Sequence, residues 1–353
     1  MGRELIFTGP REVSFRDFPE APPKEGEVRL RTLFSGISHG TEMNMYRGTA
    51  PNIHKRIVDG LFTDEPPADG GYPFTYGYEE VGEVVEVAPG VTQVRLGDRF
   101  ALSYGHRTGV VLPADSLTPT SLVPPSFPAE EAIFKALGGV AMDAYVTSQI
   151  RLGEGAVIFG LGVIGLFLVQ LCKLGGVEPV IAVDPLAGRR ALAKKFGADA
   201  ALDPRSEEVA VKVRKELTRG GGADVVFETS GSYQAIQEGI RSGAPGHSIL
   251  MAVAFYQGDA VGLRLGEEFH HGGSLGRGGC VEIRLNNSRV DRARGRRWDR
   301  DRTIGTFYRW LLEGKVRVDG LITHRFAFAE APAAFALIDQ HPDQCLKCIL
   351  CFD

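Results

Sequence analysis

The stretch from residue 75 to residue 84, TYGYEEVGEV, carries side chains that could handle a proton. Tyr78 offers a phenol that can donate a hydrogen bond, and a proton, to a developing alkoxide. Because its unperturbed pKa is about 10, it would need a nearby cation to act as a base at neutral pH, and Lys135 and His39 are the candidates. The next residue, Glu79, adds a carboxyl group. The alternative is that Tyr78 only packs against apolar neighbours.

A second polar stretch, SGISHGTEM, covers residues 35–43. It supplies the hydroxyls of Ser38 and Thr41, the imidazole of His39 and the carboxyl of Glu42. Each has an ordinary alternative, since such residues are also common as turn hydroxyls, solvated loop histidines and surface acids.

A glycine-rich segment matches the pattern GxGxxG after a short apolar strand. It consists of Gly160, Leu161, Gly162, Val163, Ile164 and Gly165. In a dinucleotide site, Gly160 makes the tight turn, Gly162 lets the backbone approach the pyrophosphate, and Gly165 lets helix and strand pack closely. The helix that follows would offer free N–H groups to the phosphates. A purely structural glycine turn is the alternative.

Asp184 stands 19 residues after the last of these glycines, at the end of the next predicted strand. A carboxylate there can accept the ribose hydroxyls of the adenosine and repels a 2′-phosphate, which favours NAD. Arg189 lies close enough to leave NADP open. Ser230 and Val253, at the ends of two later predicted strands, complete the predicted cofactor contacts.

Regular elements around this segment predict an α/β fold. After residue 155, apolar strands alternate with helices of about ten residues, which is typical of a doubly wound parallel sheet of the Rossmann type. The preceding part is rich in Gly and Pro with short β-like runs. We therefore expect a β-rich catalytic domain over 1–150, a dinucleotide-binding domain over 151–288, and a segment 289–353 that returns to the first domain.

Composition is that of an ordinary soluble protein, with 43% hydrophobic residues, 24% charged residues and a net charge of −4. These values predict neither a nucleic-acid nor a membrane partner, and the N-terminus suggests a cytoplasmic protein. The apolar run 156–172 is interrupted by the three glycines described above, which argues against a membrane-spanning helix. Five cysteines, none of them before residue 172, argue against a secreted disulfide scaffold.

The whole chain resembles the medium-chain dehydrogenase/reductase superfamily, near its sorbitol, threonine and bacteriochlorophyllide dehydrogenases. The resemblance rests on SGISHGTEM, TYGYEEVGEV, GDRF and the closing LITHRFAFAEAPAAFALID. It implies a GroES-like catalytic domain beside the Rossmann domain, an active site in the cleft between them, and a homodimer or homotetramer. It also implies that Thr41 relays a proton, with Glu42 and Glu79 as neighbouring acids.

In the zinc enzymes of this superfamily, three side chains hold a catalytic zinc. The resemblance places those positions on Ser38, Tyr78 and Gly139, none of which is a ligand of normal strength. We therefore expect no zinc. A rearranged metal site made of His39, Glu42 and Glu79 is the alternative.

Two further segments invite functional interpretation. CLKCILC at 345–351 would place its cysteines on alternating faces of a strand, which favours ordinary buried thiols over a shared metal or redox site. The run 289–302 contains seven arginines and three aspartates, and we interpret it as a solvated loop, with contact to an anionic or polyhydroxylated substrate as the alternative.

The sequence thus predicts a zinc-independent, NAD-dependent oxidoreductase that interconverts a secondary alcohol and a ketone on a polar or cyclic small molecule. One alternative is an NADPH-dependent quinone or enoyl reductase, against which Asp184 argues. The other is a non-enzymatic dinucleotide-binding protein.

Overall fold

The computed structural model describes residues 1–353 except 69, 219–220, 273–278, 280–281 and 287–296. The chain forms two compact units. The first combines residues 1–136 with 318–353, and the second spans residues 137–317. Among the described residues, no helix combines the length and the apolar character needed to span a membrane.

The first unit is built on a seven-stranded sheet with the order β16-β17-β3-β6-β7-β9, in which β8 also pairs with β3. Its strands are β3 (Glu27–Gly36), β6 (Glu80–Val87), β7 (Arg99–Leu102), β8 (Gly109–Pro113), β9 (Leu122–Val123), β16 (His324–Ala327) and β17 (Cys348–Cys351). In β3, Val28, Leu30 and Thr32 are buried on alternate positions, because successive side chains of a strand point to opposite faces. The C-terminal strand β17 pairs antiparallel with β3, placing Ile349 opposite Gly36.

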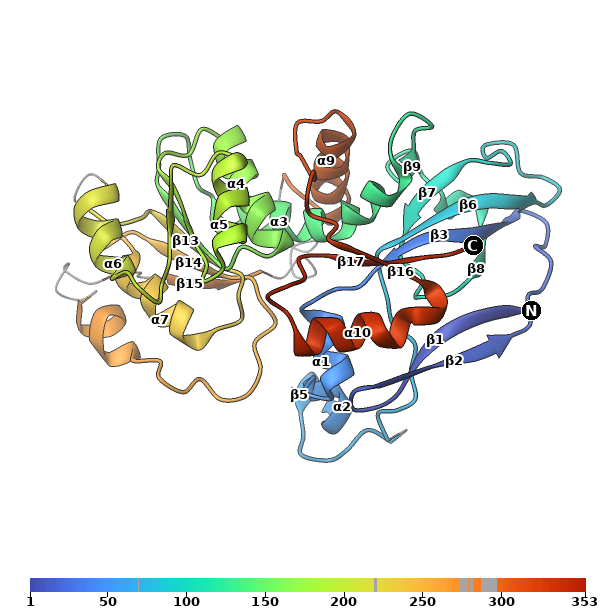
Figure 1. Cartoon of the computed structure of the whole chain (residues 1–353), viewed down its shortest axis with the longest axis horizontal. Coiled ribbons are helices and arrows are strands. Elements are labelled where there is room, and N and C mark those ends of the chain that lie inside the picture. The colour runs from blue at the N-terminus through green and yellow to red at the C-terminus, as the bar shows by residue number, and fades with distance from the viewer. Residues whose placement is uncertain (69, 219–220, 273–278, 280–281, 287–296) are drawn as a thin grey trace. The chain divides into compact units, whose positions relative to one another are not determined.

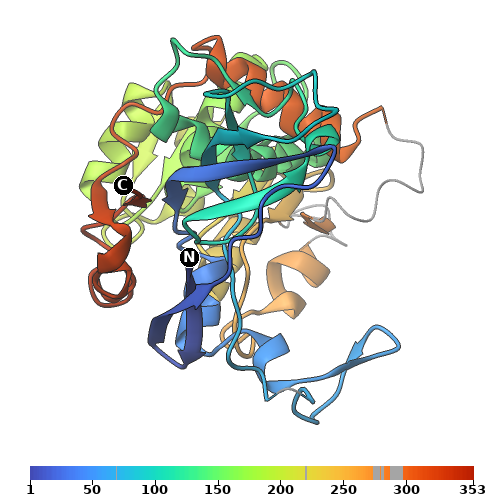
Figure 2. The ribbon, with the colours of Figure 1, turned by 90° about the vertical axis from the view of Figure 1, so that its right-hand side faces the viewer.

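Shorter elements of the first unit surround this sheet. They are β1 (Gly2–Gly9), β2 (Glu12–Phe18), α1 (Thr41–Arg47), α2 (Pro51–His54), β4 (Ile57–Val58), β5 (Leu61–Phe62) and α10 (Ala331–Gln340). Figure 1 shows α10 beside the β1–β2 hairpin and α1, and Asp339 of α10 forms ion pairs with Arg11 and Arg47 from those neighbours. Figure 2 shows the β4–β5 hairpin reaching away from β1 and β2.

The second unit contains a six-stranded parallel sheet with the order β12-β11-β10-β13-β14-β15. Its strands are β10 (Ala156–Phe159), β11 (Val180–Val183), β12 (Ala200–Leu202), β13 (Val225–Glu228), β14 (Ile249–Ala252) and β15 (Glu282–Leu285). Its helices are α3 (Lys135–Ser148), which begins at the unit boundary, α4 (Val163–Leu174), α5 (Ala187–Lys195), α6 (Val209–Lys212), α7 (Tyr233–Ser242) and α9 (Arg300–Leu312). Every residue of β10, β11 and β13 is buried, as expected for a parallel sheet covered on both faces. The predicted α/β fold is therefore confirmed.

The unit boundaries differ from those expected from the sequence, because α3 and α9 both belong to the second unit. Phe307 of α9 is fully buried and packs edge-on against Phe167 of α4, with ring centroids 4.8 Å apart. A side chain at Gly138 of α3 would overlap the Phe307 ring, so these helices are in close contact. This packing explains why the second unit extends beyond 151–288 at both ends. Most of the arginine-rich run 289–302 lies outside the described residues.

Candidate active site and cofactor loop

The glycine loop between β10 and α4 has the geometry of a close turn. Gly160 has a φ of +85°, and a side chain there would lie 2.7 Å from the amide nitrogen of Ser230. A Cβ at Gly165 would lie 1.9 Å from the carbonyl oxygen of Gly160, so α4 can approach the loop only with glycine at this position. At Gly162, by contrast, an added Cβ would meet no protein atom within 4 Å. The loop is therefore crowded on its inner side and open at Gly162, where α4 begins.

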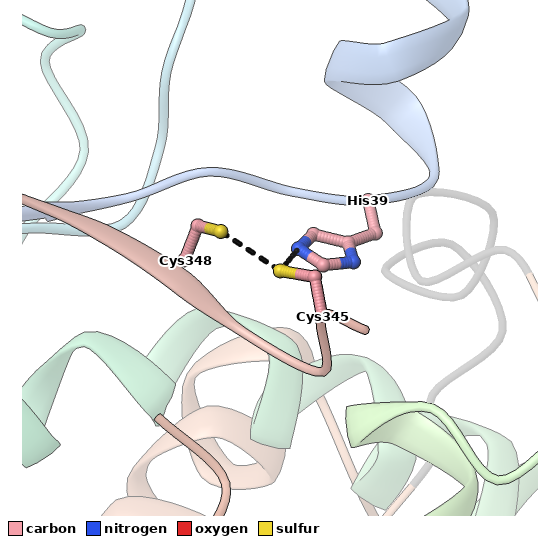
Figure 3. A group of neighbouring side chains, drawn as sticks. All are labelled: His39, Cys345 and Cys348. Carbon is pink, nitrogen blue, oxygen red and sulfur yellow. Dashed lines mark hydrogen bonds between the residues drawn. The ribbon is translucent and has the colours of Figure 1, made fainter. Parts of the chain in front are cut away.

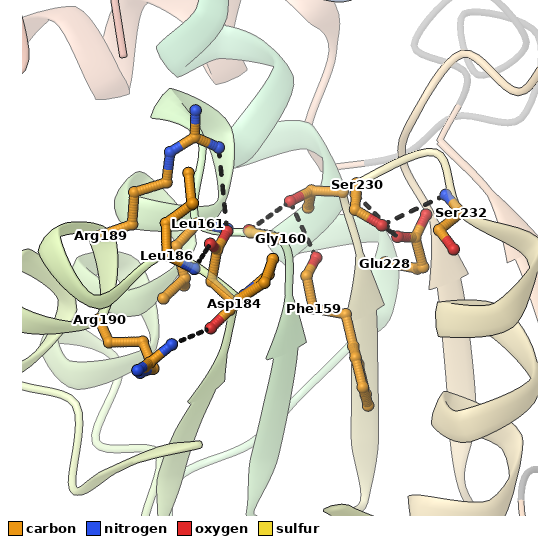
Figure 4. A network of polar contacts seen from close by, with 12 residues as sticks. Phe159, Gly160, Leu161, Asp184, Leu186, Arg189, Arg190, Glu228, Ser230 and Ser232 are labelled. Carbon is orange, nitrogen blue, oxygen red and sulfur yellow. Dashed lines mark hydrogen bonds and ion pairs between the residues drawn. The ribbon is translucent and has the colours of Figure 1, made fainter. Parts of the chain in front are cut away.

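Asp184, which follows β11, is bonded to the same loop (Figure 4). Its carboxylate accepts hydrogen bonds from the backbone N–H of Leu161 and of Leu186, each at 2.8 Å. Arg189 Nη1 lies 3.9 Å from this carboxylate, and Arg190 donates to the Asp184 backbone oxygen at 2.7 Å. The predicted acidic residue and Arg189 thus lie beside the glycine loop.

Ser230 and Val253 lie after the next two strands of the sheet. The carboxylate of Glu228, at the end of β13, accepts hydrogen bonds from the Ser230 backbone and hydroxyl (Figure 4). It also accepts one from the Tyr256 hydroxyl. The N–H of Val253 donates to the backbone oxygen of Glu228 at 2.9 Å. The ends of β10, β11, β13 and β14 therefore gather all the predicted cofactor residues, and carboxyl ends of parallel strands are where such folds bind ligands.

In the first unit, the hydroxyls of the two predicted proton-handling stretches meet. Tyr78 donates a hydrogen bond to Ser38 Oγ at 2.5 Å, and its hydroxyl also interacts with the side chain of Thr41. Ser38 is buried, whereas Tyr78 and Thr41 are partly exposed. Three hydroxyls from two separate stretches of sequence therefore form one cluster.

The pKa of Tyr78 lies well above its usual value. Burial is the main cause, and the carboxyls of Glu79 and Glu42 add to it. Neither proposed cation offsets this rise, since Lys135 donates to the backbone oxygen of Ala101 at 3.0 Å. Tyr78 is therefore a neutral phenol at neutral pH, suited to donating a proton and not to acting as a base.

Glu79 forms a buried ion pair that the sequence reasoning did not find. Its Oε2 lies 2.7 Å from Nζ of Lys347, and both side chains are almost completely removed from solvent. Burial raises the pKa of Glu79 to about 7, against the opposing effect of Lys347. Lys347 Nζ also donates to the backbone oxygen of Ile37 at 2.8 Å. Glu79 is thus paired with a lysine near the C-terminus, while its charge still acts on Tyr78.

Glu42 belongs to a second buried polar network. It accepts a hydrogen bond from the backbone N–H of Ser38 at 3.1 Å and one from His106 Nε2 at 2.8 Å. Nδ1 of His106 lies 2.5 Å from Ser35 Oγ, which donates in turn to Glu80 at 3.2 Å. Burial lowers the pKa of His106, but Glu42 and its neighbouring acids outweigh that effect and raise it overall. The pKa of His106 is therefore raised inside a buried network of acids, which no local sequence signal indicated.

His39 does not join the hydroxyl cluster. Its Nε2 lies 3.6 Å from Sγ of Cys345, and Sγ of Cys345 lies 2.8 Å from Sγ of Cys348 (Figure 3). The expectation that these cysteines point to opposite faces is wrong, because β17 begins only at Cys348 and Cys345 lies in the irregular segment before it. The hydrogen bond from Cys348, with the help of His39, lowers the pKa of Cys345.

The chain is similar in sequence to known dehydrogenases. Residues 163–272 match a family model described as zinc-binding dehydrogenase. The D-guloside 3-dehydrogenase of Escherichia coli (strain K12) is 30% identical over 361 residues, with 98% of each chain covered. The L-threonine 3-dehydrogenase of Pyrococcus abyssi is 29% identical over 357 residues, covering 91% of this chain and 90% of its own.

Solved structures share the fold. A crystal structure of 2R,3R-butanediol dehydrogenase from Bacillus subtilis superposes with a TM-score of 0.76 at 20% identity, covering 99% of both chains. An Escherichia coli oxidoreductase/dehydrogenase of unknown specificity gives a TM-score of 0.77 at 20% identity, covering 100% of this chain and 99% of its own. The chain belongs to the medium-chain dehydrogenase/reductase superfamily. It is an alcohol dehydrogenase-like oxidoreductase.

The residues at the family's catalytic zinc positions do not fit a zinc ion. Ser38 and Tyr78 are neutral hydroxyls that bond to each other, and Gly139 has no side chain. Zinc in proteins is bound by thiolate, imidazole or carboxylate groups. The alternative set of His39, Glu42 and Glu79 is not assembled either, because Glu42 is bonded to His106 and Glu79 to Lys347.

Proposed function

We propose that this protein is an NAD-dependent oxidoreductase that interconverts a secondary alcohol and a ketone on a polar, cyclic substrate, with no zinc at the family's catalytic position. The observation that carries the proposal is the hydrogen bond between Tyr78 and Ser38, which fills two of the three zinc-ligand positions with proton donors. Nicotinamide supplies the hydride chemistry when bound, so the protein has only to orient the reacting carbon and serve the oxygen.

The hydroxyl cluster is suited to that second task. Tyr78 keeps its proton at neutral pH because burial and nearby acids raise its pKa. It can therefore donate a hydrogen bond to a ketone oxygen that becomes negative as hydride arrives. Ser38 and Thr41 offer further hydroxyls through which Tyr78 can regain a donated proton. This arrangement substitutes hydrogen bonding for the charge stabilisation that a metal gives in other members.

The second unit is suited to holding the cofactor. The open position at Gly162 and the N-terminus of α4 would receive the pyrophosphate, and Asp184 would accept a ribose hydroxyl and disfavour a 2′-phosphate. Ser230 and Val253, after the central strands, would lie along the nicotinamide half. Relatives of this fold have been solved with NADP and with NADH, so the choice between them rests on Asp184 and its neighbour Arg189.

The nature of the substrate is suggested by one relative that matches over nearly the whole chain, the D-guloside 3-dehydrogenase of Escherichia coli (strain K12). A hydroxyl on a sugar ring is a secondary alcohol on a polar ring, the substrate class that we propose here. Such a substrate exposes several hydroxyls, and a protein that reads them by hydrogen bonds can select one position strongly.

A panel of reactions tests this proposal. Purified protein is incubated with NAD or NADP and with glycosides, linear polyols, threonine or butanediol, and reduced cofactor is followed by absorbance. We expect oxidation of one or more glycosides with NAD, and a kcat/KM at least about tenfold lower with NADP. Turnover of enones or quinones with NADPH, and of no alcohol, would instead support a double-bond reductase. Tight NAD binding without any turnover would support a non-enzymatic role. Light scattering on the same sample would show whether the protein is the dimer or tetramer that we propose.

A further inference from the structure

His39, Cys345 and Cys348 bring three metal-binding atoms together in the first unit. One nitrogen and two sulfur atoms all lie within 4.8 Å of one another. The two cysteines are almost fully buried, whereas His39 is partly exposed (Figure 3). This cluster lies outside the family's zinc positions at Ser38, Tyr78 and Gly139, and the function proposed above makes no use of it.

We propose that His39, Cys345 and Cys348 bind one zinc ion. Two thiolates and one imidazole form a soft donor set that selects zinc over magnesium or calcium. Both cysteines bind as thiolates, and any proton that a thiol still carries is released to solvent, so the ion and its two thiolates carry no net charge. A neutral centre avoids most of the cost of burying an ion.

The distances fit a tetrahedral ion after a small movement. With bond lengths of about 2.3 Å to sulfur and about 2.0 Å to nitrogen, neighbouring ligands of a tetrahedral zinc lie roughly 3.5 to 3.8 Å apart. The separation of 3.6 Å between His39 Nε2 and Cys345 Sγ is already in this range. The separation of 2.8 Å between the two sulfur atoms is shorter, and rotation of one cysteine side chain would widen it.

The backbone holds the two ligand segments side by side. Ile37 donates its N–H to the backbone oxygen of Cys348 at 3.1 Å, and Lys347 Nζ donates to the backbone oxygen of Ile37 at 2.8 Å. These bonds continue the antiparallel pairing of β3 with β17, which fixes the register between the loop bearing His39 and the segment bearing the cysteines. Little ordering is therefore needed when an ion enters. Nζ of Lys347 lies 2.7 Å from Oε2 of Glu79, so this lysine is paired with a side chain outside the metal-binding cluster.

Three protein ligands leave a fourth coordination position. In proteins, sites of this kind hold water there, whereas purely structural sites are closed by a fourth side chain. Partial exposure of His39 gives the ion a route of entry from solvent. An ion here would fix the loop that carries Ser38 and Thr41 to the C-terminal strand.

Metal content of the purified protein tests the site. The full chain is prepared under reducing conditions without chelator, loaded with zinc, desalted and analysed for metal by mass spectrometry. Wild type is expected to hold one equivalent of zinc, and Cys345→Ser and Cys348→Ser are expected to lower zinc affinity at least about tenfold in competition with a chelator. Cys351→Ser is the matched control, because Cys351 lies on the same strand outside the cluster, and it should retain the ion. Replacing zinc with cobalt should give a sulfur-to-metal charge-transfer band that is absent from the two cluster variants.

His39→Gln provides a second test that leaves both cysteines in place. It is expected to weaken zinc binding while leaving the far-ultraviolet circular dichroism unchanged. Zinc retained at full stoichiometry in all three cluster variants would overturn the proposal. So would wild type that binds neither zinc nor cobalt with its thiols reduced, or a Cys345–Cys348 disulfide that forms in the presence of equimolar zinc. These readouts do not depend on activity, so the metal site and the proposed reaction can fail separately.

Discussion

Nζ of Lys347 lies 2.7 Å from Oε2 of Glu79, and the two side chains come from the two separate segments of sequence that make up the first unit. Both are buried, so each charge depends on the other for compensation. Lys347 also stabilises the loop before α1 through its bond to Ile37. The pair therefore joins the residue between Tyr78 and β6 to the residue directly before the C-terminal strand β17.

Lys347→Met should destabilise the protein at pH 8 by about 3 kcal/mol, because it leaves Glu79 buried without a counter-ion. The aliphatic part of the side chain is retained, so loss of packing contributes little. Denaturant unfolding measures the change in the free energy of unfolding. The double variant Lys347→Met with Glu79→Gln should recover most of the loss, since it removes both charges. Equal destabilisation in the single and the double variant would contradict this account.

Glu79→Gln should change the pH dependence of stability. The folded protein holds a proton on Glu79 up to about pH 7, whereas the unfolded chain releases it near the ordinary value of 4.5. Glu79 therefore contributes most to stability below about pH 4.5, and that contribution is lost as pH rises to about 7. The variant does not titrate, so it should match wild type near pH 5 and become the more stable protein by pH 8.

Unfolding at pH 5, 6, 7 and 8 checks this prediction, and the difference should reach at most on the order of 3 kcal/mol. Glu79 interacts electrostatically with His106 and Glu80, so the measured difference includes the effect of the substitution on these two groups. Parallel pH profiles would show that Glu79 has an ordinary pKa in the folded protein.

Tyr78→Phe should lower kcat by roughly 10² to 10⁴-fold on a substrate found by the panel, because a positioned proton donor contributes in that range. Binding of NAD, measured by fluorescence, should stay unchanged, since the cofactor loop belongs to the other unit. Tyr76→Phe is the control, because the Tyr76 ring packs edge-on against Tyr78 with centroids 6.1 Å apart. If the Tyr78→Phe variant has the same kcat as wild type, Tyr78 serves only in packing.

Gly162→Ala and Gly165→Ala should differ in a way that separates cofactor binding from folding. An added methyl at Gly162 meets no protein atom within 4 Å, so stability should be near wild type while NAD binding weakens at least about tenfold. At Gly165 the methyl would overlap the Gly160 carbonyl, and the variant should lose several kcal/mol of stability. Calorimetric titration and thermal unfolding of both variants test the pair. Normal NAD binding by Gly162→Ala would show that the pyrophosphate does not lie beside Gly162.

The second unit was the easier to predict because its signals are local. The GxGxxG pattern predicts a helix directly after the glycines, and α4 spans Val163–Leu174. The alternation of strands with helices of about ten residues is less regular at α6, which ends at Lys212 and is followed by a wider turn to Leu217. Thr218 bonds to the backbone oxygen of Val213 and helps to end this segment.

The buried polar groups of the first unit were not predictable in the same way. His106 and Glu42 are 64 residues apart, and Lys347 and Glu79 are separated by most of the chain, so no spacing rule connects them. Cys345 was misplaced by a small error in a strand boundary. In a strand, side chains three residues apart point to opposite faces. Because Cys345 lies in the irregular segment before β17, its sulfur atom instead lies close to that of Cys348.

Both carboxylate oxygens of Asp184 are bonded to backbone amides, one in the glycine loop and one in the N-cap residue of α5. Asp184 is also the side chain that an engineer would replace to make the protein accept a 2′-phosphate. A small residue there would remove the repelling charge but also release the loop that receives the pyrophosphate. Cofactor preference and loop rigidity are thus coupled through one residue, so evolution toward NADP at this site would require a substitution that keeps an acceptor, such as Asp184→Asn, before Arg189 could be used.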